Sequence, residues 1–161
     1  MSELFDVPFH SLQSGDIAVM LKESYREWSE YDRWVNQWIA YDAEIFEHPD
    51  TVGRCGFATR TGGNLIGFMS WDPRSRPCAT IGHNCILPPY RNHGYGSWQV
   101  QRAIEVFRER GFTQARVSTG VDSFFAASRR MYEKNGFQRC EPFIKTQEAM
   151  VFYTLEIPRN S

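Results

Sequence analysis

A glycine-rich turn between a strand and a helix constrains the fold of this chain more than any other feature. The turn runs from Pro88 to Gly96, and it joins a β-like stretch, Ala79 to Leu87, to a helix-like stretch, Ser97 to Arg110. Glycine lets the backbone approach a ligand closely and adopt positive φ angles. The following helix points its unpaired N–H groups and the positive end of its dipole at that ligand. The pattern therefore predicts a site for an anion, most often a phosphate or a pyrophosphate.

A second motif follows one strand and one helix further along the chain. Residues 132–137 read Tyr-Glu-Lys-Asn-Gly-Phe, and the turn itself contains Arg91-x-x-Gly94-x-Gly96. The turn resembles the acetyl-CoA pyrophosphate loop of the GNAT N-acetyltransferases, and the second motif resembles the end of their second cofactor-binding helix. The resemblance covers roughly Leu65 to Phe137, whereas the first sixty residues carry no motif of that family.

Composition limits the classes of protein to which this chain can belong. Its 161 residues suit a single domain, residues 1–161, with a full core. A net charge of −1 argues against a general nucleic-acid binder, and no apolar stretch is long enough to span a membrane. The first residues show no basic region and no apolar signal-peptide core, so we expect a cytoplasmic protein. The four cysteines form no Cys-x-x-Cys pair, and we expect no metal site.

Turn signals and periodicity predict the element order β, α, α, β, β, β, α, β, α, β, β. Helix caps are expected at Ser14, at Ser29 together with Asp32, and at Asp122 or Ser123. The clearest hairpin signal is Thr-Gly-Gly-Asn at residues 61–64. The expected strands with defined bounds are residues 54–60, 65–71, 79–87 and 114–119, followed by β-like segments near 137–142 and 150–157.

This order indicates the α/β class, with a mixed and mostly antiparallel central sheet and helices on both faces. A doubly wound fold does not fit the order, because three consecutive strands in the middle are joined by tight turns. The GNAT resemblance implies the same architecture. In that family the parallel strands 4 and 5 splay apart, and acetyl-CoA enters the wedge between them.

The resemblance assigns most of the expected cofactor contacts to the turn and to the strand before it. Backbone N–H groups of the turn should bind the pyrophosphate, and Arg91 should add a fixed charge with a forked set of donors. The N–H of Ile86 should stabilise the oxyanion that develops on the thioester, with Leu87 beside the pantetheine arm. The residues expected to bind the pyrophosphate are the end of the turn and the first residue of the helix: Asn92, His93, Gly94, Tyr95, Gly96 and Ser97.

One position of the second cofactor-binding helix departs from the family pattern. Many GNAT members carry Asn seven residues before the tyrosine, where it bonds the pantetheine, but this chain has Phe125 there. Ser128, one turn before Tyr132, is the expected substitute. Because the loss amounts to about one neutral hydrogen bond, it should weaken cofactor binding only modestly.

Two residues are the expected catalytic groups. Tyr132 is the expected general acid, because attack by an amine on a thioester expels a thiolate that a nearby phenol can protonate. Its alternative role is that of a half-buried, packed aromatic. His83 is the expected base, since its ordinary pKa suits proton transfer near neutrality, and its alternative role is a histidine satisfied within the core. Asp72, Glu44 or a chain of waters are the other candidates for the base.

Aromatic residues in the first two helices mark the expected acceptor site, because this region covers the acceptor in GNAT proteins. Trp28 and Tyr41 lie off the periodic stripe and are expected to line the pocket, whereas the stripe itself is expected to be core. The acidic residues between them would favour a cationic acceptor, unless they form a solvated face. These acidic residues are Glu27, Glu30, Asp32 and Asp42.

The sequence therefore predicts an N-acetyltransferase that moves an acetyl group directly from acetyl-CoA to a primary amine of a small molecule or a peptide. No nucleic acid or membrane partner is expected, and a homodimer is compatible with the sequence. Two other functions stay open. The missing Asn and the unassigned base would suit a CoA-binding module without transferase activity, and an open groove would suit an acetyltransferase of protein N-termini or lysines.

Overall fold

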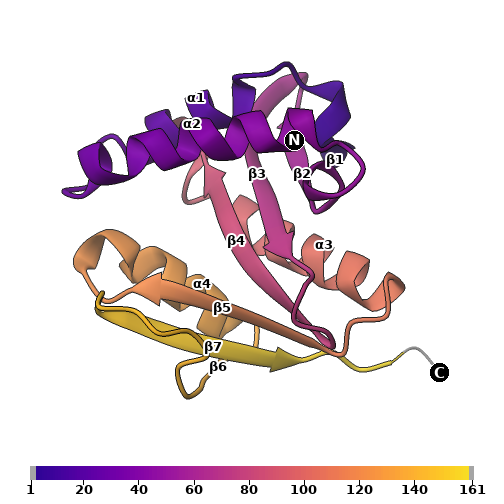
Figure 1. Cartoon of the computed structure of the whole chain (residues 1–161), viewed down its shortest axis with the longest axis vertical. Coiled ribbons are helices and arrows are strands. Elements are labelled where there is room, and N and C mark those ends of the chain that lie inside the picture. The colour runs from indigo at the N-terminus through magenta and orange to yellow at the C-terminus, as the bar shows by residue number, and fades with distance from the viewer. Residues whose placement is uncertain (1–2, 160–161) are drawn as a thin grey trace. The chain divides into compact units, whose positions relative to one another are not determined.

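The computed structural model describes residues 3–159, so both ends of the predicted domain, Met1 and Ser161, lie outside the described residues. Figure 1 shows the helices and strands in the order that the sequence predicts. The strands are β1 (Leu4–Pro8), β2 (Gly56–Thr61), β3 (Asn64–Asp72), β4 (Cys78–Ile86), β5 (Gln114–Gly120), β6 (Gln138–Arg139) and β7 (Met150–Glu156). The α-helices are α1 (Asp16–Tyr25), α2 (Tyr31–Glu47), α3 (Tyr95–Glu109) and α4 (Ala126–Lys134).

The strands in residues 3–159 form one seven-stranded sheet in the order β1-β2-β3-β4-β5-β7-β6. β4 and β5 pair in parallel through Cys78–Thr80 and Gln114–Arg116, while the pairs β1–β2, β2–β3, β5–β7 and β6–β7 are antiparallel. The predicted mixed and mostly antiparallel sheet with parallel strands 4 and 5 is therefore confirmed. β6 is shorter than the predicted segment near residues 137–142.

The hairpin between β2 and β3 has the two glycines of the predicted turn at its tip. Gly62 and Gly63 have φ angles of 55° and 84°. Two successive residues at positive φ form the tight turn whose twist matches that of the flanking strands, and glycine reaches these angles without steric cost. The turn therefore sets the register in which Thr61 pairs with Asn64.

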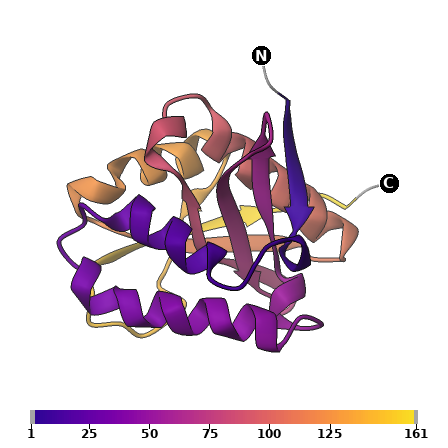
Figure 2. The same ribbon diagram turned by 90° about the horizontal axis from the view of Figure 1, so that it is seen from above.

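The described chain divides into two compact units. The first runs to Ser70 and includes His83–Tyr95, and the second contains Trp71–Gly82 and the residues from Gly96 onward. In the first unit, α1 and α2 lie side by side (Figure 2) and bury apolar residues against β2, β3 and β4. The buried residues of this core include Ile17, Met20, Leu21, Trp38, Ile45, Ala58, Phe68 and Cys85.

The start of α1 is capped by a residue from α2. The carboxylate of Asp42 accepts hydrogen bonds from the N–H groups of Gly15 at 2.8 Å and Ala18 at 2.9 Å. Gly15, with a φ angle of 103°, occupies the N-cap position, so the expected cap at Ser14 is wrong. A side chain from elsewhere in the fold replaces the local cap, because Asp42 is buried and can satisfy two orphan helix donors at once.

The other helix ends agree only in part with the sequence. α2 begins at Tyr31 with Glu30 at its N-cap, so the expected cap at Ser29 is also wrong. Asp122 is a cap as expected, because its side chain accepts the N–H of Phe124 at 3.0 Å. In the second unit, Phe107 of α3 packs against Trp71 of β3 and against Phe112, which lies between α3 and β5.

Candidate functional site

The turn after β4 exposes its backbone. Asn92 and Gly94 have φ angles of 65° and 79°, and Asn92, His93 and Gly94 are all exposed. A Cβ atom placed on Gly94 would meet no atom of the described chain within 4 Å. The His93 ring folds back over the turn, since its Nδ1 lies 2.7 Å from the carbonyl oxygen of Arg91 and its ring stacks on Tyr95. The turn therefore offers open space beside backbone at positive φ, and its expected role as an anion site stays a prediction.

The end of β4 directs one N–H group away from the neighbouring strand β3. Leu87 donates its N–H to the carbonyl of Ile66 in β3 at 2.8 Å. Because successive residues of a strand point their N–H groups to opposite sides, the N–H of Ile86 points away from β3. Pro88 then begins a single 3₁₀ turn. The expected role of Ile86, as a donor to the carbonyl of a thioester, stays a prediction.

The guanidinium of Arg91 contacts two backbone carbonyls of the first unit. Its Nε donates to the carbonyl of Ile86 at 3.1 Å, and its Nη2 donates to the carbonyl of Ser24 at 2.7 Å. The side chain that was expected to supply charge at a pyrophosphate is thus engaged at the ends of β4 and α1. Sequence spacing carries no signal for this arrangement, since Ser24 and Arg91 are 67 residues apart.

In the second unit, the Tyr-Glu-Lys-Asn-Gly-Phe motif holds α4 against α3. Asn135 donates from Nδ2 to the Ser97 hydroxyl at 3.1 Å and to the Met131 carbonyl at 2.7 Å. Its Oδ1 accepts from the amide of Gln101 at 3.0 Å. The predicted turn residue Ser97 is therefore bonded to the end of the second motif, which joins the start of α3 to the end of α4.

Gly96 lies within the first turn of α3, beside α4. A Cβ atom placed on Gly96 would lie 4.0 Å from Cγ of Met131, an ordinary contact distance. Neighbouring atoms thus leave room for a side chain at both glycines, but the positive φ angle of Gly94 disfavours other residues, whereas Gly96 has no such angle.

Tyr132 lies within the core of the second unit. It is 2% exposed, and its ring packs against Phe137 at 5.4 Å and Tyr153 at 6.3 Å between centroids. The neighbouring Glu133 accepts the Tyr153 hydroxyl at 2.6 Å. Burial, together with the Glu133 carboxylate, raises the pKa of Tyr153. The position is compatible with the packed role of Tyr132, and its role as a general acid stays a prediction.

The position of the usual family Asn is occupied by a packed aromatic ring. Phe125 stacks edge-on against Phe124, and a Cβ atom on Gly120 would lie only 2.8 Å from the Phe125 ring. Phe125 therefore fills the space over Gly120. Ser128 lies one turn further along in α4 and is half-buried, and its proposed contact with pantetheine stays a prediction.

The structure brings His83 and Tyr41 together in the first unit. Their ring centroids are 4.8 Å apart, and the Ser70 hydroxyl donates to the His83 carbonyl at 2.6 Å. Burial lowers the pKa of His83, which favours the neutral form that a base requires. Burial also raises the pKa of Tyr41, so this phenol stays protonated. Tyr41 is therefore a direct neighbour of His83, the expected base.

The two acidic candidates for the base, Asp72 and Glu44, differ in their surroundings. Asp72 binds Arg74 through both carboxylate oxygens, at 3.0 Å and 2.7 Å, and this hydrogen bonding lowers the pKa of Asp72. A carboxylate held in that way is a weaker base than an ordinary one. Glu44 is exposed on α2.

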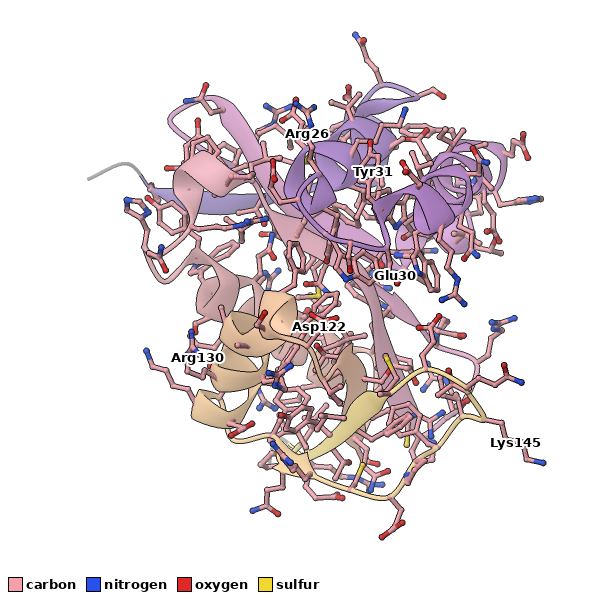
Figure 3. The ribbon with its side chains drawn as sticks, turned by 90° about the vertical axis from the view of Figure 1, so that its left-hand side faces the viewer. Arg26, Glu30, Tyr31, Asp122, Arg130 and Lys145 are labelled. Carbon is pink, nitrogen blue, oxygen red and sulfur yellow. The ribbon has the colours of Figure 1, made fainter. Side chains whose placement is uncertain are left out.

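The aromatic residues at the connection between α1 and α2 form a chain of ring contacts. Trp28 lies 5.9 Å from Tyr25 and 6.3 Å from Trp34 between ring centroids, and all three are half-buried against the core of the first unit. Arg26, Glu30 and Tyr31 mark this connection in Figure 3. Asp42 is buried and caps α1, so its expected contribution to an acidic acceptor surface is wrong.

Two searches over residues 3–159 bear on other classes of function. No group of three or more His, Cys, Asp or Glu side chains in this range could hold a metal ion. In the same range, every helix is too short or too polar to cross a membrane.

Comparison with known proteins identifies the family of this chain. The Acetyltransferase (GNAT) family matches residues 16–137. A 50-residue segment is 38% identical to the uncharacterized N-acetyltransferase YsnE of Bacillus subtilis (strain 168), and this match covers 31% of the chain and 33% of that relative. The chain thus matches about a third of the length of that protein.

Two solved structures share the fold at low identity. One is the PaiA N-acetyltransferase of Thermoplasma acidophilum in complex with coenzyme A, with a TM-score of 0.69 at 14% identity over 97% of this chain and 99% of that one. The other is yncA of Salmonella typhimurium with its cofactor acetyl-CoA, with a TM-score of 0.66 at 14% identity over 99% of this chain and 96% of that one. The family match spans more than half of the sequence and includes both motifs, and the chain belongs to the GNAT acetyltransferase family.

Proposed function

We propose that this protein is a cytoplasmic N-acetyltransferase that moves an acetyl group from acetyl-CoA to a primary amine of a small molecule or a peptide. The observation that carries the proposal is the exposed turn at residues 92–94, with positive φ at Asn92 and Gly94, which follows a strand whose Ile86 N–H points away from β3. Family membership supports acyl transfer as the class of reaction. The single domain spanning residues 1–161 remains part of this proposal.

The residues of the turn fit a CoA diphosphate. The backbone N–H groups from Asn92 to Ser97 would bind it. A Cβ atom at Gly94 would occupy open space beside the backbone, and the glycine keeps this space free for the ligand. Ile86 and Leu87 would line the pantetheine arm, with Ser128 replacing the usual Asn as its hydrogen-bond partner. Two relatives of the same fold, solved with coenzyme A and with acetyl-CoA, support this choice of ligand.

Acetyl-CoA, when bound, supplies an acetyl thioester. In the proposed mechanism, the N–H of Ile86 donates to the carbonyl oxygen of the acetyl group, where negative charge develops as the amine attacks. His83, whose neutral form is favoured by burial, accepts the proton that the acceptor ammonium must lose. Tyr132 supplies a proton to the departing thiolate. Trp28 and Tyr41 line the acceptor site in this proposal.

A thiol-release assay tests the proposed function directly. The full chain is incubated with acetyl-CoA and each member of a panel of small amines, polyamines, amino acids and short peptides, and free CoA thiol is measured over time. We expect amine-dependent release with at least one class of acceptor, together with stabilisation of the protein by acetyl-CoA in a thermal melt. Stabilisation without release for any amine would instead indicate a CoA-binding module, and an unmoved melting temperature at millimolar acetyl-CoA would refute both.

A further inference from the structure

Arg91 joins two parts of the first unit that lie far apart in the sequence. Its two donors reach the carbonyl of Ser24, at 2.7 Å, and the carbonyl of Ile86, at 3.1 Å. Ser24 belongs to the last turn of α1, where the helix carbonyls have no partner within the helix. A cation at this end of a helix also complements the helix dipole. Arg91 therefore caps the end of α1 from within the turn that follows β4.

A second contact attaches the same end of α1 to β4. The hydroxyl of Tyr25, the last residue of α1, donates to the carbonyl of Asn84 at 2.9 Å. The chain continues directly from these contacts into residues 26–34, which contain the ring contacts of Trp28 and Trp34. The position of this aromatic segment therefore depends on where the end of α1 is held.

We propose that Arg91 is a positioning residue, through which a diphosphate bound in the turn orders the aromatic segment at residues 26–34. The inference rests on the proposed function, because it takes the turn as the diphosphate site and the aromatic segment as the acceptor side. The diphosphate contacts the backbone N–H groups of Asn92 to Ser97, while the guanidinium stays on its two carbonyls. Binding that fixes the turn then also fixes the end of α1.

A direct bond from the guanidinium to the diphosphate is the competing role for Arg91. Moving these donors to a phosphate would take them from the carbonyl of Ser24, a residue that is only 3% exposed. A buried carbonyl that loses its partner carries the full cost of its desolvation. The observed contacts therefore favour the positioning role.

Hydrogen–deuterium exchange of the full chain, with and without CoA, tests the proposal. The variants are Arg91→Ala and a control, Arg130→Ala, which removes an exposed arginine of α4 (Figure 3). In the wild type and the control, we expect CoA to slow exchange in both the turn and residues 26–34. In Arg91→Ala, CoA should still slow exchange in the turn, but the protection of residues 26–34 should be lost.

CoA affinity separates the two roles of Arg91. Loss of a charged hydrogen bond to the diphosphate would lower CoA affinity about tenfold or more, and would leave the affinity for pantetheine, which lacks the diphosphate, unchanged. That result would overturn the proposal, as would unchanged protection of residues 26–34 in Arg91→Ala. If the alanine variant fails to fold, Arg91→Lys serves in its place, because it keeps the charge but cannot bridge both carbonyls.

The result for the wild type separates this inference from the proposed function. If CoA protects the turn but not residues 26–34 of the wild type, the positioning role is refuted and the cofactor site stands. If CoA binds neither the wild type nor the control, the proposed function is itself refuted.

Discussion

Replacing Asp42 by alanine should destabilise the protein strongly, although Asp42 lies outside the proposed catalytic groups. The change removes both acceptors of the Gly15 and Ala18 N–H groups. Loss of an N-cap costs about 1 kcal/mol, and a buried N–H left without a partner costs about 1–3 kcal/mol more. We therefore expect the free energy of unfolding to fall by about 2–4 kcal/mol. Asp42→Asn keeps one carbonyl oxygen and should lose about half as much.

Urea denaturation followed by far-ultraviolet circular dichroism measures this loss. For a protein of this size, each kcal/mol lowers Tm by about 2–4 °C, so Asp42→Ala should melt at least about 4 °C below the wild type. Asp50→Ala is the matched control, since Asp50 is exposed and follows α2, and its effect should stay within about 0.5 kcal/mol. If Asp42→Ala also lowers the free energy of unfolding by no more than this control does, with an unaltered m-value, the capping role of Asp42 is refuted.

Three further predictions concern the proposed site. Gly94→Val should weaken CoA binding. The control Gly63→Val has a similar positive φ angle and similar open space, so it should lower stability by a comparable amount but leave CoA affinity unchanged. Equal CoA affinities of the two variants would count against the turn as the CoA site. Tyr132→Phe keeps the packed ring and should lower kcat about 10²–10⁴-fold in steady-state assays without changing CoA affinity, and a full kcat would return Tyr132 to a packing role. Because burial lowers the pKa of His83, the unfolded chain binds more protons than the folded protein below about pH 6.5. The free energy of unfolding should therefore decrease as the pH is lowered through this range. In thermal melts between about pH 8 and about pH 5, Tm should decrease less in His83→Gln than in the wild type as the pH is lowered. An equal decrease in both proteins would contradict the lowered pKa of His83.

Short-range chemistry explains why the order of elements could be predicted from the sequence. The glycines at residues 62 and 63 adopt the positive φ angles that a tight hairpin turn demands, and Gly111 and Gly136 end α3 and α4 at φ angles of 86° and 92°. Such residues act through their own backbone, so their effect is visible in the sequence. The same holds for Asp122, which caps a turn that begins one residue later.

Contacts between distant residues explain what the sequence could not predict. Asp42 replaces the expected cap at Ser14 because the packing of α2 on α1 delivers its carboxylate to the helix start. Arg91 was expected to face an anion, but the fold places carbonyl acceptors from α1 and β4 within its reach. No spacing rule encodes such pairs, because each depends on tertiary packing. The catalytic roles of Tyr132 and His83 stay predictions for the same reason, since they depend on where two substrates lie.

The hydrogen bonds of Asn135 have a consequence for how this protein can change over evolutionary time. Its amide meets Ser97 and Gln101 of α3, and each partner presents a complementary donor or acceptor. The bond between Asn135 and Ser97 is part-buried, so a substitution at either position leaves the other with an unmatched polar group, whereas Gln101 is exposed and can bond water instead. Positions 97 and 135 should therefore vary together among close relatives. Substitutions at the start of α3 and at the end of α4, although these lie far apart in the chain, would therefore be correlated.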